Sequence, residues 1–186
     1  MKSLQINQQF NTMSTPPSEA EADTDDPLVL RAPSTVDGAA IAQLIRSCPP
    51  LDINSTYAYL LLTEHFAHTC VVATKGTQLV GFVSAYLPPS QKNVLFVWQV
   101  AVHPSMRGQR LAVRMLEHLL QRTHCQHVRY VETTVAPENR ASRRLFHHLA
   151  AQYQTTIQEL PFFQPHHFGE DAQSQTEPLL RIGPIP

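Results

Sequence analysis

Two spacings of hydrophobic residues alternate along the chain, and together they predict its secondary structure. Short runs that are continuously apolar, or that alternate with polar residues, are typical of strands. They predict strands at Leu28–Arg31, Thr69–Thr74, Leu79–Tyr86, Val94–Val102 and Val128–Val135, with weaker ones at Tyr153–Gln158 and Glu177–Ile182. Val94–Val102 is apolar at almost every position, which predicts a central strand buried on both faces.

Apolar residues three and four positions apart predict helices between these strands. The first helix is predicted to begin after a cap at Ser34 or Thr35 and to end at Ser47. The second, at Thr56–Phe66, is capped by Asn54 or Ser55. Two later helices are predicted at Gly108–Arg122 and Glu138–Ala151. Between the last two strands we expect a long loop that contains Pro161, Phe162, Phe163, His166, His167 and Phe168. The order of elements predicts an α/β fold, in which helices cover a mixed sheet.

The first 26 residues differ in composition from the rest of the chain. They hold one of the 14 basic and five of the 15 acidic residues, so 13 basic and 10 acidic residues remain and the body carries a charge of +3. Because this stretch is polar and lacks periodic apolar positions, we expect a disordered acidic tail at residues 1–26 and one domain at residues 27–186. It also lacks the pattern of a secretory signal, which favours a cytoplasmic location.

The overall composition excludes several classes of protein. A net charge of −1 provides no basic field for nucleic acid, and no apolar stretch approaches the roughly 20 residues of a membrane-spanning helix. Cys48, Cys70 and Cys125 have no C-x-x-C spacing, so we expect reduced, buried thiols. His166 and His167 are adjacent and have no third ligand at zinc spacing, so we expect no metal.

The segment between strand Val94–Val102 and the next helix is the first candidate for chemistry. A strand, a turn that contains Gly108 and a helix start aim several unpaired backbone N–H groups at one point, which favours an anion such as a pyrophosphate. Arg107 and Arg110 add positive charge. An ordinary strand-to-helix turn with solvated arginines fits the same residues, so both interpretations stay open here.

Two motifs in this order resemble those of the GNAT acetyltransferases. Arg107-Gly108-Gln109-Arg110-Leu111-Ala112 resembles the family's acyl-CoA pyrophosphate loop, R/Q-x-x-G-x-G/A, and the preceding Trp98-Gln99-Val100-Ala101-Val102 resembles the end of its central strand. Pro137-Glu138-Asn139-Arg140-Ala141-Ser142-Arg143-Arg144-Leu145-Phe146 is similar to the second CoA-facing motif, N-x-x-[AS]-x-x-L-[YF]. The resemblance implies the GNAT fold, a mixed, mostly antiparallel sheet of six to seven strands with about four helices, and acetyl-CoA as co-substrate.

Longer blocks resemble one branch of that family, the L-2,4-diaminobutyrate acetyltransferases of ectoine synthesis. The blocks are Leu51–Leu62, Gly81–Tyr86, Leu95–Pro104, Glu132–Val135 and Glu177–Pro184, so the similarity covers about residues 28–184. The branch implies a homodimer that transfers acetyl from acetyl-CoA directly to the γ-amine of L-2,4-diaminobutyrate. The alternatives are a GNAT for another small diamine or a protein lysine, and a non-catalytic CoA-binding module.

The resemblance also implies the residues that bind the co-substrate: backbone N–H groups of the strand and the loop, and residues of the second motif near the pantetheine. They are Val100, Val102, Arg107, Gly108, Gln109, Arg110, Leu111, Ala112, Asn139, Ser142 and Phe146. Two of them depart from the family pattern. Arg110 replaces a glycine, so we expect the loop either to adopt an ordinary helical φ there or to lean the side chain away. Phe146 replaces a tyrosine thought to protonate the CoA thiolate, and a phenyl ring cannot do so.

The acceptor requires a base, because an alkylammonium with a pKa of about 10.4 costs roughly 4–5 kcal/mol to deprotonate at pH 7. We expect Glu132, the only acidic residue in its strand, to bind the acceptor and take the proton directly or through water; the alternative is a solvated edge glutamate. Three candidates for binding the acceptor have structural alternatives: Asp52 could serve only as a turn or helix-start residue, and Trp98 and Tyr57 could be core aromatics. The substrate-binding candidates are Asp52, Tyr57, Trp98, Gln99, Thr134 and His167, the last as a carboxylate or lid contact.

Overall fold

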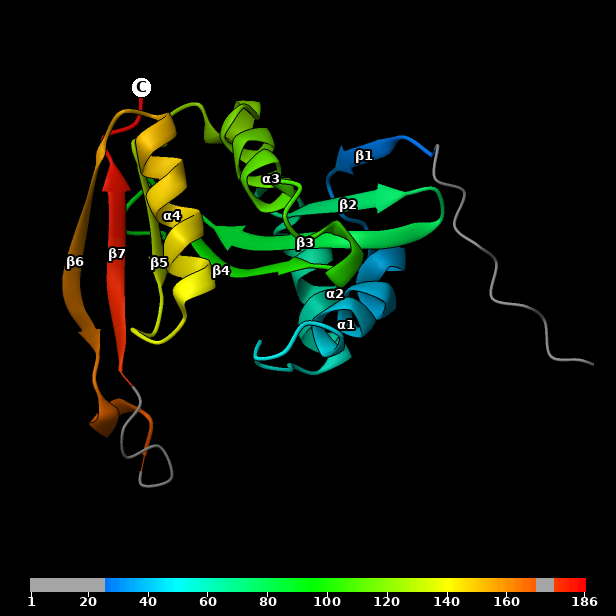
Figure 1. The fold of residues 1–186 in the computed structure, drawn as a ribbon, viewed down its shortest axis with the longest axis horizontal. Helices are drawn as coiled ribbons and strands as arrows, with labels where there is room; N and C mark the ends of the chain where they lie inside the picture. Colours follow the sequence, from blue (N-terminus) through cyan, green and yellow to red (C-terminus); the bar gives the residue numbers. More distant parts are fainter. Residues whose placement is uncertain (1–25, 170–175) are drawn as a thin grey trace, which may run out of the picture.

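The chain folds around one seven-stranded sheet in the computed structural model, which describes residues 26–169 and 176–186. The strand order is β1-β2-β3-β4-β5-β7-β6 (Figure 1). All neighbours are antiparallel except β4 and β5, which confirms the α/β fold with a mixed, mostly antiparallel sheet. The bounds are β1 Leu28–Arg31, β2 Val71–Lys75, β3 Gln78–Tyr86, β4 Val94–Val102, β5 Tyr130–Thr134, β6 Thr156–Phe163 and β7 Glu177–Gly183. Apart from Asp26, the expected tail lies outside the described residues.

Helices cover both faces of this sheet, α1 and α2 on one and α3 and α4 on the other (Figure 1). Neighbouring strand residues point to opposite faces, and Val72 accordingly packs with α1 and α2 whereas Val71 packs with α3 and α4. No helix in the described ranges is long and apolar enough to cross a membrane. The helices are α1 Gly38–Arg46, α2 Thr56–His65, α3 Leu111–Leu120 and α4 Arg140–Gln152.

The predicted N-terminal cap of the second helix is confirmed at Ser55, whereas the first helix, α1, has Asp37 as its N-cap, and Ser34 begins only the short turn before it. The hydroxyl of Ser55 accepts a hydrogen bond from the backbone N–H of Ala58 at 3.3 Å and so begins α2. Before α1, the carboxylate of Asp37 accepts hydrogen bonds from the N–H of Ser34 at 2.7 Å and from the guanidinium of Arg31 at 2.7 and 2.8 Å. These bonds tie the end of β1 to the start of α1, and the hydrogen bond from Arg31 is the main reason that the pKa of Asp37 is lowered.

We expect the Asp37→Asn variant to be less stable than the wild type by about 1–2 kcal/mol at pH 7. The pKa of Asp37 is lower in the folded protein than in the unfolded chain. The carboxylate therefore contributes its full share to the free energy of unfolding above the unfolded pKa, and this share is lost as the pH falls through the folded pKa. Urea unfolding of both proteins between pH 7 and pH 3 measures the difference, which should shrink below about pH 4. A difference that stays constant across this range would show that the ion pair is not its source.

Strand β6 is longer than the sequence predicts. The prediction of a loop at Pro161, Phe162 and Phe163 is wrong, because these residues complete the strand Thr156–Phe163. Proline has no N–H to donate to a ladder, but β6 is an edge strand, and its register with β7 shifts between Leu160 and Phe163. The other predicted elements match the observed ones to within a few residues.

A bulge in β4 changes which side chains the central strand presents to each face. The register with β3 pairs Ser84 with Gln99 but Ala85 with Val97, so Trp98 is an extra residue. Val97 and Val100 therefore face α3 and α4, whereas Ala101 packs with α1 and α2. The prediction that this strand is buried on both faces is wrong at Trp98, a residue that is 45% exposed.

Candidate active site

The parallel strands β4 and β5 separate halfway along β4. They pair only from Val94 to Phe96 and from Tyr130 to Glu132, although β4 continues to Val102. In Figure 1 the first four strands run across the view, whereas β5, β6 and β7 run down it. The divergence leaves the β5-facing edge of the second half of β4 without a strand partner in the described part of the chain, and its backbone groups are available to a ligand.

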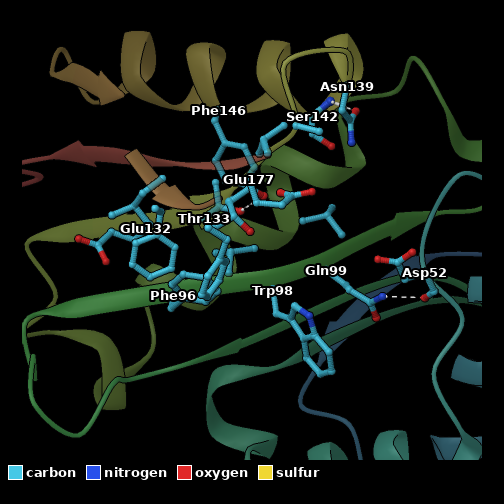
Figure 2. A pocket seen from close by; sticks show the side chains of 18 of the residues that line it. Asp52, Phe96, Trp98, Gln99, Glu132, Thr133, Asn139, Ser142, Phe146 and Glu177 are labelled. Carbon is cyan, nitrogen blue, oxygen red and sulfur yellow. Dashed lines mark hydrogen bonds between the residues drawn. The ribbon is translucent and has the colours of Figure 1, made fainter. Parts of the chain in front are cut away.

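A cleft of about 1310 Å³ opens at this separation. Its walls come from the α1–α2 connection, β4, β5, the start of α4, and the β6–β7 segments (Figure 2). Nine of the residues predicted from the sequence line it: Asp52, Trp98, Gln99, Val100, Glu132, Thr134, Asn139, Ser142 and Phe146. The sequence missed other lining residues, among them Phe96, Thr133, Phe162, Phe163, Phe168 and Arg181.

Glu132 is a buried carboxylate in the wall of this cleft, and the alternative of a solvated edge glutamate is wrong. Its side chain is 6% exposed, and Oε1 accepts a hydrogen bond from Nη1 of Arg181 at 2.6 Å. Strand β5 lies between β4 and β7, which explains the burial. Burial and the negative charge of Glu132 together raise the pKa of the nearby Tyr86 hydroxyl, with burial as the larger cause.

Gln99 faces away from the cleft centre and holds the α1–α2 connection. It is buried, and its amide Nε2 donates to the backbone carbonyl of Asp52 at 2.9 Å (Figure 2). Its backbone N–H donates to the hydroxyl of Ser84 at 3.1 Å, and its Oε1 accepts a longer bond from Tyr59 at 3.5 Å. The side chain of Gln99 thus fixes the backbone of Asp52 next to Trp98.

We expect the Gln99→Leu variant to lose about 1–3 kcal/mol of unfolding free energy, because it leaves the carbonyl of Asp52 and the hydroxyl of Tyr59 without this partner. Tyr59→Phe removes two long bonds, the 3.5 Å bond to Gln99 and the 3.4 Å bond that the hydroxyl accepts from the backbone N–H of Asn54, and should cost about 1 kcal/mol or less. Chemical denaturation of the two variants measures both losses. Equal losses would contradict the view that the bond to the Asp52 carbonyl dominates.

Of three acceptor candidates, Trp98 lines the cleft as the sequence predicts, whereas Tyr57 and His167 lie outside its lining. Trp98 is not a core aromatic, because its half-exposed indole lines the cleft. Tyr57 is 66% exposed on α2, and it lies neither in the core nor in the cleft wall. His167 lies outside the cleft lining, in a short turn where its Nδ1 accepts a hydrogen bond from the N–H of Gln164 at 2.9 Å.

The start of α4 forms the opposite wall of the cleft from Asp52 and Trp98 (Figure 2). Asn139 is the N-cap of this helix, and its Oδ1 accepts a hydrogen bond from the N–H of Ser142 at 3.1 Å. Asn139 therefore caps the helix and also lines the cleft. Phe146 is 2% exposed and joins the cleft wall to the core.

The loop Arg107–Ala112 lies outside the cleft lining and leads into α3. Arg110 does not adopt the ordinary helical φ that we expected as one option; its φ is 58°, in the left-handed region. Its side chain leans away from the loop, as the other option expects, and Nη2 lies 2.5 Å from Nε2 of His148. Gly108 also has a positive φ, of 77°, and nothing lies within 4 Å of the position that a Cβ would take. Leu111, by contrast, is a core residue.

No group of three or more metal-ligating side chains occurs within residues 26–169 and 176–186. Cys48, Cys70 and Cys125 are free and buried, as the sequence predicts. Burial is the main cause that raises the pKa of Cys70 to about 11, and it also raises the pKa of Cys125. Cys70 and Cys125 are therefore poor nucleophiles at neutral pH.

Residues 39–150 match the model of the acetyltransferase (GNAT) family. With its separated parallel strands and its loop before α3, the chain belongs to this family and is an N-acetyltransferase.

Comparisons with individual proteins narrow the family. The chain is 58% identical over 157 residues to L-2,4-diaminobutyric acid acetyltransferase from Bordetella parapertussis, covering 84% of each chain. It is 42% identical over 160 residues to the protein of that name from Halomonas elongata, covering 86% of this chain and 82% of the other. Among solved structures, the chain is similar to diaminobutyrate acetyltransferase EctA from Paenibacillus lautus, which was solved in complex with its substrate L-2,4-diaminobutyric acid and coenzyme A. The TM-score is 0.81 at 40% identity, and the match covers 86% of this chain and 96% of that one. Within its family the chain thus belongs to the diaminobutyrate acetyltransferases.

Proposed function

We propose that this enzyme transfers the acetyl group of acetyl-CoA directly to the γ-amine of L-2,4-diaminobutyrate, as a step in the synthesis of ectoine. The observation that carries the proposal is a single cleft that places the carboxylate of Glu132 and the side chain of Asp52 beside the open edge of β4. Two carboxylates suit an acceptor with two ammonium groups. The identity to the diaminobutyrate acetyltransferases over most of the chain supports the choice of acceptor.

The residues present fit acetyl-CoA. The open edge of β4 at Val100 and Val102 offers backbone N–H groups to an extended pantetheine arm, and one of them polarises the thioester carbonyl. The turn at Gly108 and the first N–H groups of α3 suit a pyrophosphate, with Arg107, Gln109, Arg110 and Ala112 around it. The amide of Asn139, with Ser142 and Phe146, borders the arm from the α4 side.

Acetyl-CoA supplies the thioester carbon that the amine attacks; a C–N bond forms and the C–S bond breaks. Glu132 holds the ammonium and takes its proton, directly or through a water molecule, as the nitrogen attacks. Asp52 binds the other ammonium, Trp98 walls the pocket, and Thr134 borders it on β5. Phe146 cannot donate a proton to the thiolate, which is a good leaving group without one because a thiol has a pKa near 8.5.

We further propose a cytoplasmic homodimer. The three free, buried thiols suit a reducing compartment. Edge strand β6 exposes Leu160, Phe162 and Phe163 to between 41% and 42%, and such an apolar edge favours association with a second copy. Sedimentation of the purified protein measures this directly, and a monomer at micromolar concentration would contradict it.

A thiol-release assay with acetyl-CoA and a panel of amines tests the proposed reaction. The panel contains L-2,4-diaminobutyrate, other small diamines and a lysine peptide. We expect release with diaminobutyrate at the highest kcat/KM. Release with the peptide but none with diaminobutyrate would overturn the proposal, and no release with any amine would favour a CoA-binding module.

A further inference from the structure

Arg181 is a charged residue of the cleft wall to which the proposed reaction gives no role. It lies on β7 directly opposite Glu132 on β5, so both side chains project from the same face of the sheet. Its side chain is 27% exposed, whereas that of Glu132 is 6% exposed. The guanidinium therefore extends further toward the open part of the cleft than the carboxylate that it contacts.

Two contacts fix the orientation of this guanidinium. Nη1 donates to Oε1 of Glu132 at 2.6 Å, and Cζ lies 4.0 Å from the centroid of the Tyr130 ring. Stacking on a ring and a hydrogen bond at one corner together define the plane of the group. A guanidinium has five N–H donors. Within the described residues Glu132 is its hydrogen-bond partner, which leaves donors on the same plane for a ligand.

The remaining donors suit a carboxylate, because the planar fork of arginine matches its two oxygens. The other arginines of the described cleft wall, Arg140 and Arg144, belong to α4, on the side of Asn139 and Ser142. Arg181 is thus the cation placed beside Glu132. A ligand with an ammonium beside Glu132 and a carboxylate beside Arg181 would place each charged group next to a side chain of opposite charge. An amino acid with a second amine carries both groups a few bonds apart.

We propose that Arg181 binds the carboxylate of the amino-acid acceptor and thereby selects a 2,4-diamino acid over a plain diamine. This inference rests on the proposed function. A diamine without the carboxylate leaves the guanidinium donors unmatched and places a positive charge near another positive charge, which is unfavourable.

The test compares L-2,4-diaminobutyrate with 1,3-diaminopropane, which is the same molecule without its carboxylate. We measure kcat/KM for both amines, at saturating acetyl-CoA, in the wild type and in the Arg181→Met, Arg181→Lys and Arg129→Met variants. Arg129 is an exposed arginine outside the cleft lining and serves as the matched control. The ratio of the two kcat/KM values reports recognition of the carboxylate, because both amines use Glu132 in the same way.

We expect Arg181→Met to lower the ratio by about ten- to a hundredfold, through the diaminobutyrate value. The value for diaminopropane should stay level or rise, since a repelling charge is removed. Arg181→Lys should restore part of the ratio, because lysine keeps the charge but not the fork. Arg129→Met should leave it at the wild-type value.

An equal fall for both amines would show that Arg181 acts only through Glu132 and would overturn the inference while leaving the proposed function intact. A wild type that does not acetylate diaminobutyrate would overturn both. If Arg181→Met fails to fold, as judged by circular dichroism, the lysine variant decides the matter: an unchanged ratio in a folded Arg181→Lys protein contradicts recognition by the fork.

Discussion

Replacement of Glu132 by glutamine should lower kcat by about 100-fold or more and raise the KM for the amine. A positioned general base contributes about 10²–10⁴-fold to a rate. Glutamine keeps the shape of the side chain but can neither take a proton nor attract the ammonium. The buried position of Glu132, between β4 and β7, allows bulk water little access to replace it. Steady-state kinetics with varied amine at saturating acetyl-CoA separates the two effects.

The control for this variant is Glu64→Gln, which removes a carboxylate from α2 outside the cleft lining. Its kcat and KM should match those of the wild type. If Glu132→Gln keeps the wild-type kcat and changes only KM, Glu132 binds the amine but is not the base. The proton would then leave through another group or directly to water.

Replacement of Asp52 by asparagine should raise the KM for diaminobutyrate by about ten- to a hundredfold, with kcat and the KM for acetyl-CoA close to the wild type. Asp52 lies across the cleft from the α4 wall, and Gln99 fixes its backbone by the 2.9 Å bond to its carbonyl. A charged hydrogen bond to the non-reacting ammonium, desolvated when the acceptor fills the cleft, accounts for this magnitude.

The acetyl-CoA side provides an internal control for Asp52→Asn, because the co-substrate is expected along β4 and α4 rather than at the α1–α2 connection. A rise in both KM values together would indicate a distorted cleft instead of a lost ammonium contact. A lower kcat with an unchanged KM for the amine would contradict the assignment of Asp52 as a binding residue.

Motifs that are local in the sequence could be predicted, because they depend on neighbours within one turn or one strand. The strand Val94–Val102, the cap at Ser55 and the helix start at Asn139 are of this kind. Glu132 was also predictable as a candidate, and it lines the cleft, since a single acid in an apolar strand is unusual. Its burial was not, because it depends on where β5 lies in the sheet.

Features that depend on register between distant segments could not be predicted from periodicity. Arg181 meets Glu132 only because β7 inserts between β5 and β6 in one particular register, and a shift by one residue would turn its side chain to the other face. The exposure of Trp98 follows from a bulge against β3, which alternation within β4 does not reveal. The strand at Pro161 is tolerated only because β6 is an edge.

The identity of the acetylated product is the most direct test of the proposed reaction. We would incubate the enzyme with acetyl-CoA and L-2,4-diaminobutyrate and assign the product by two-dimensional NMR. Acetylation of the γ-nitrogen gives an amide proton coupled to the γ-methylene, and this is the predicted result. An amide proton coupled to the α-methine, or no acetylated diaminobutyrate at all, would contradict the account.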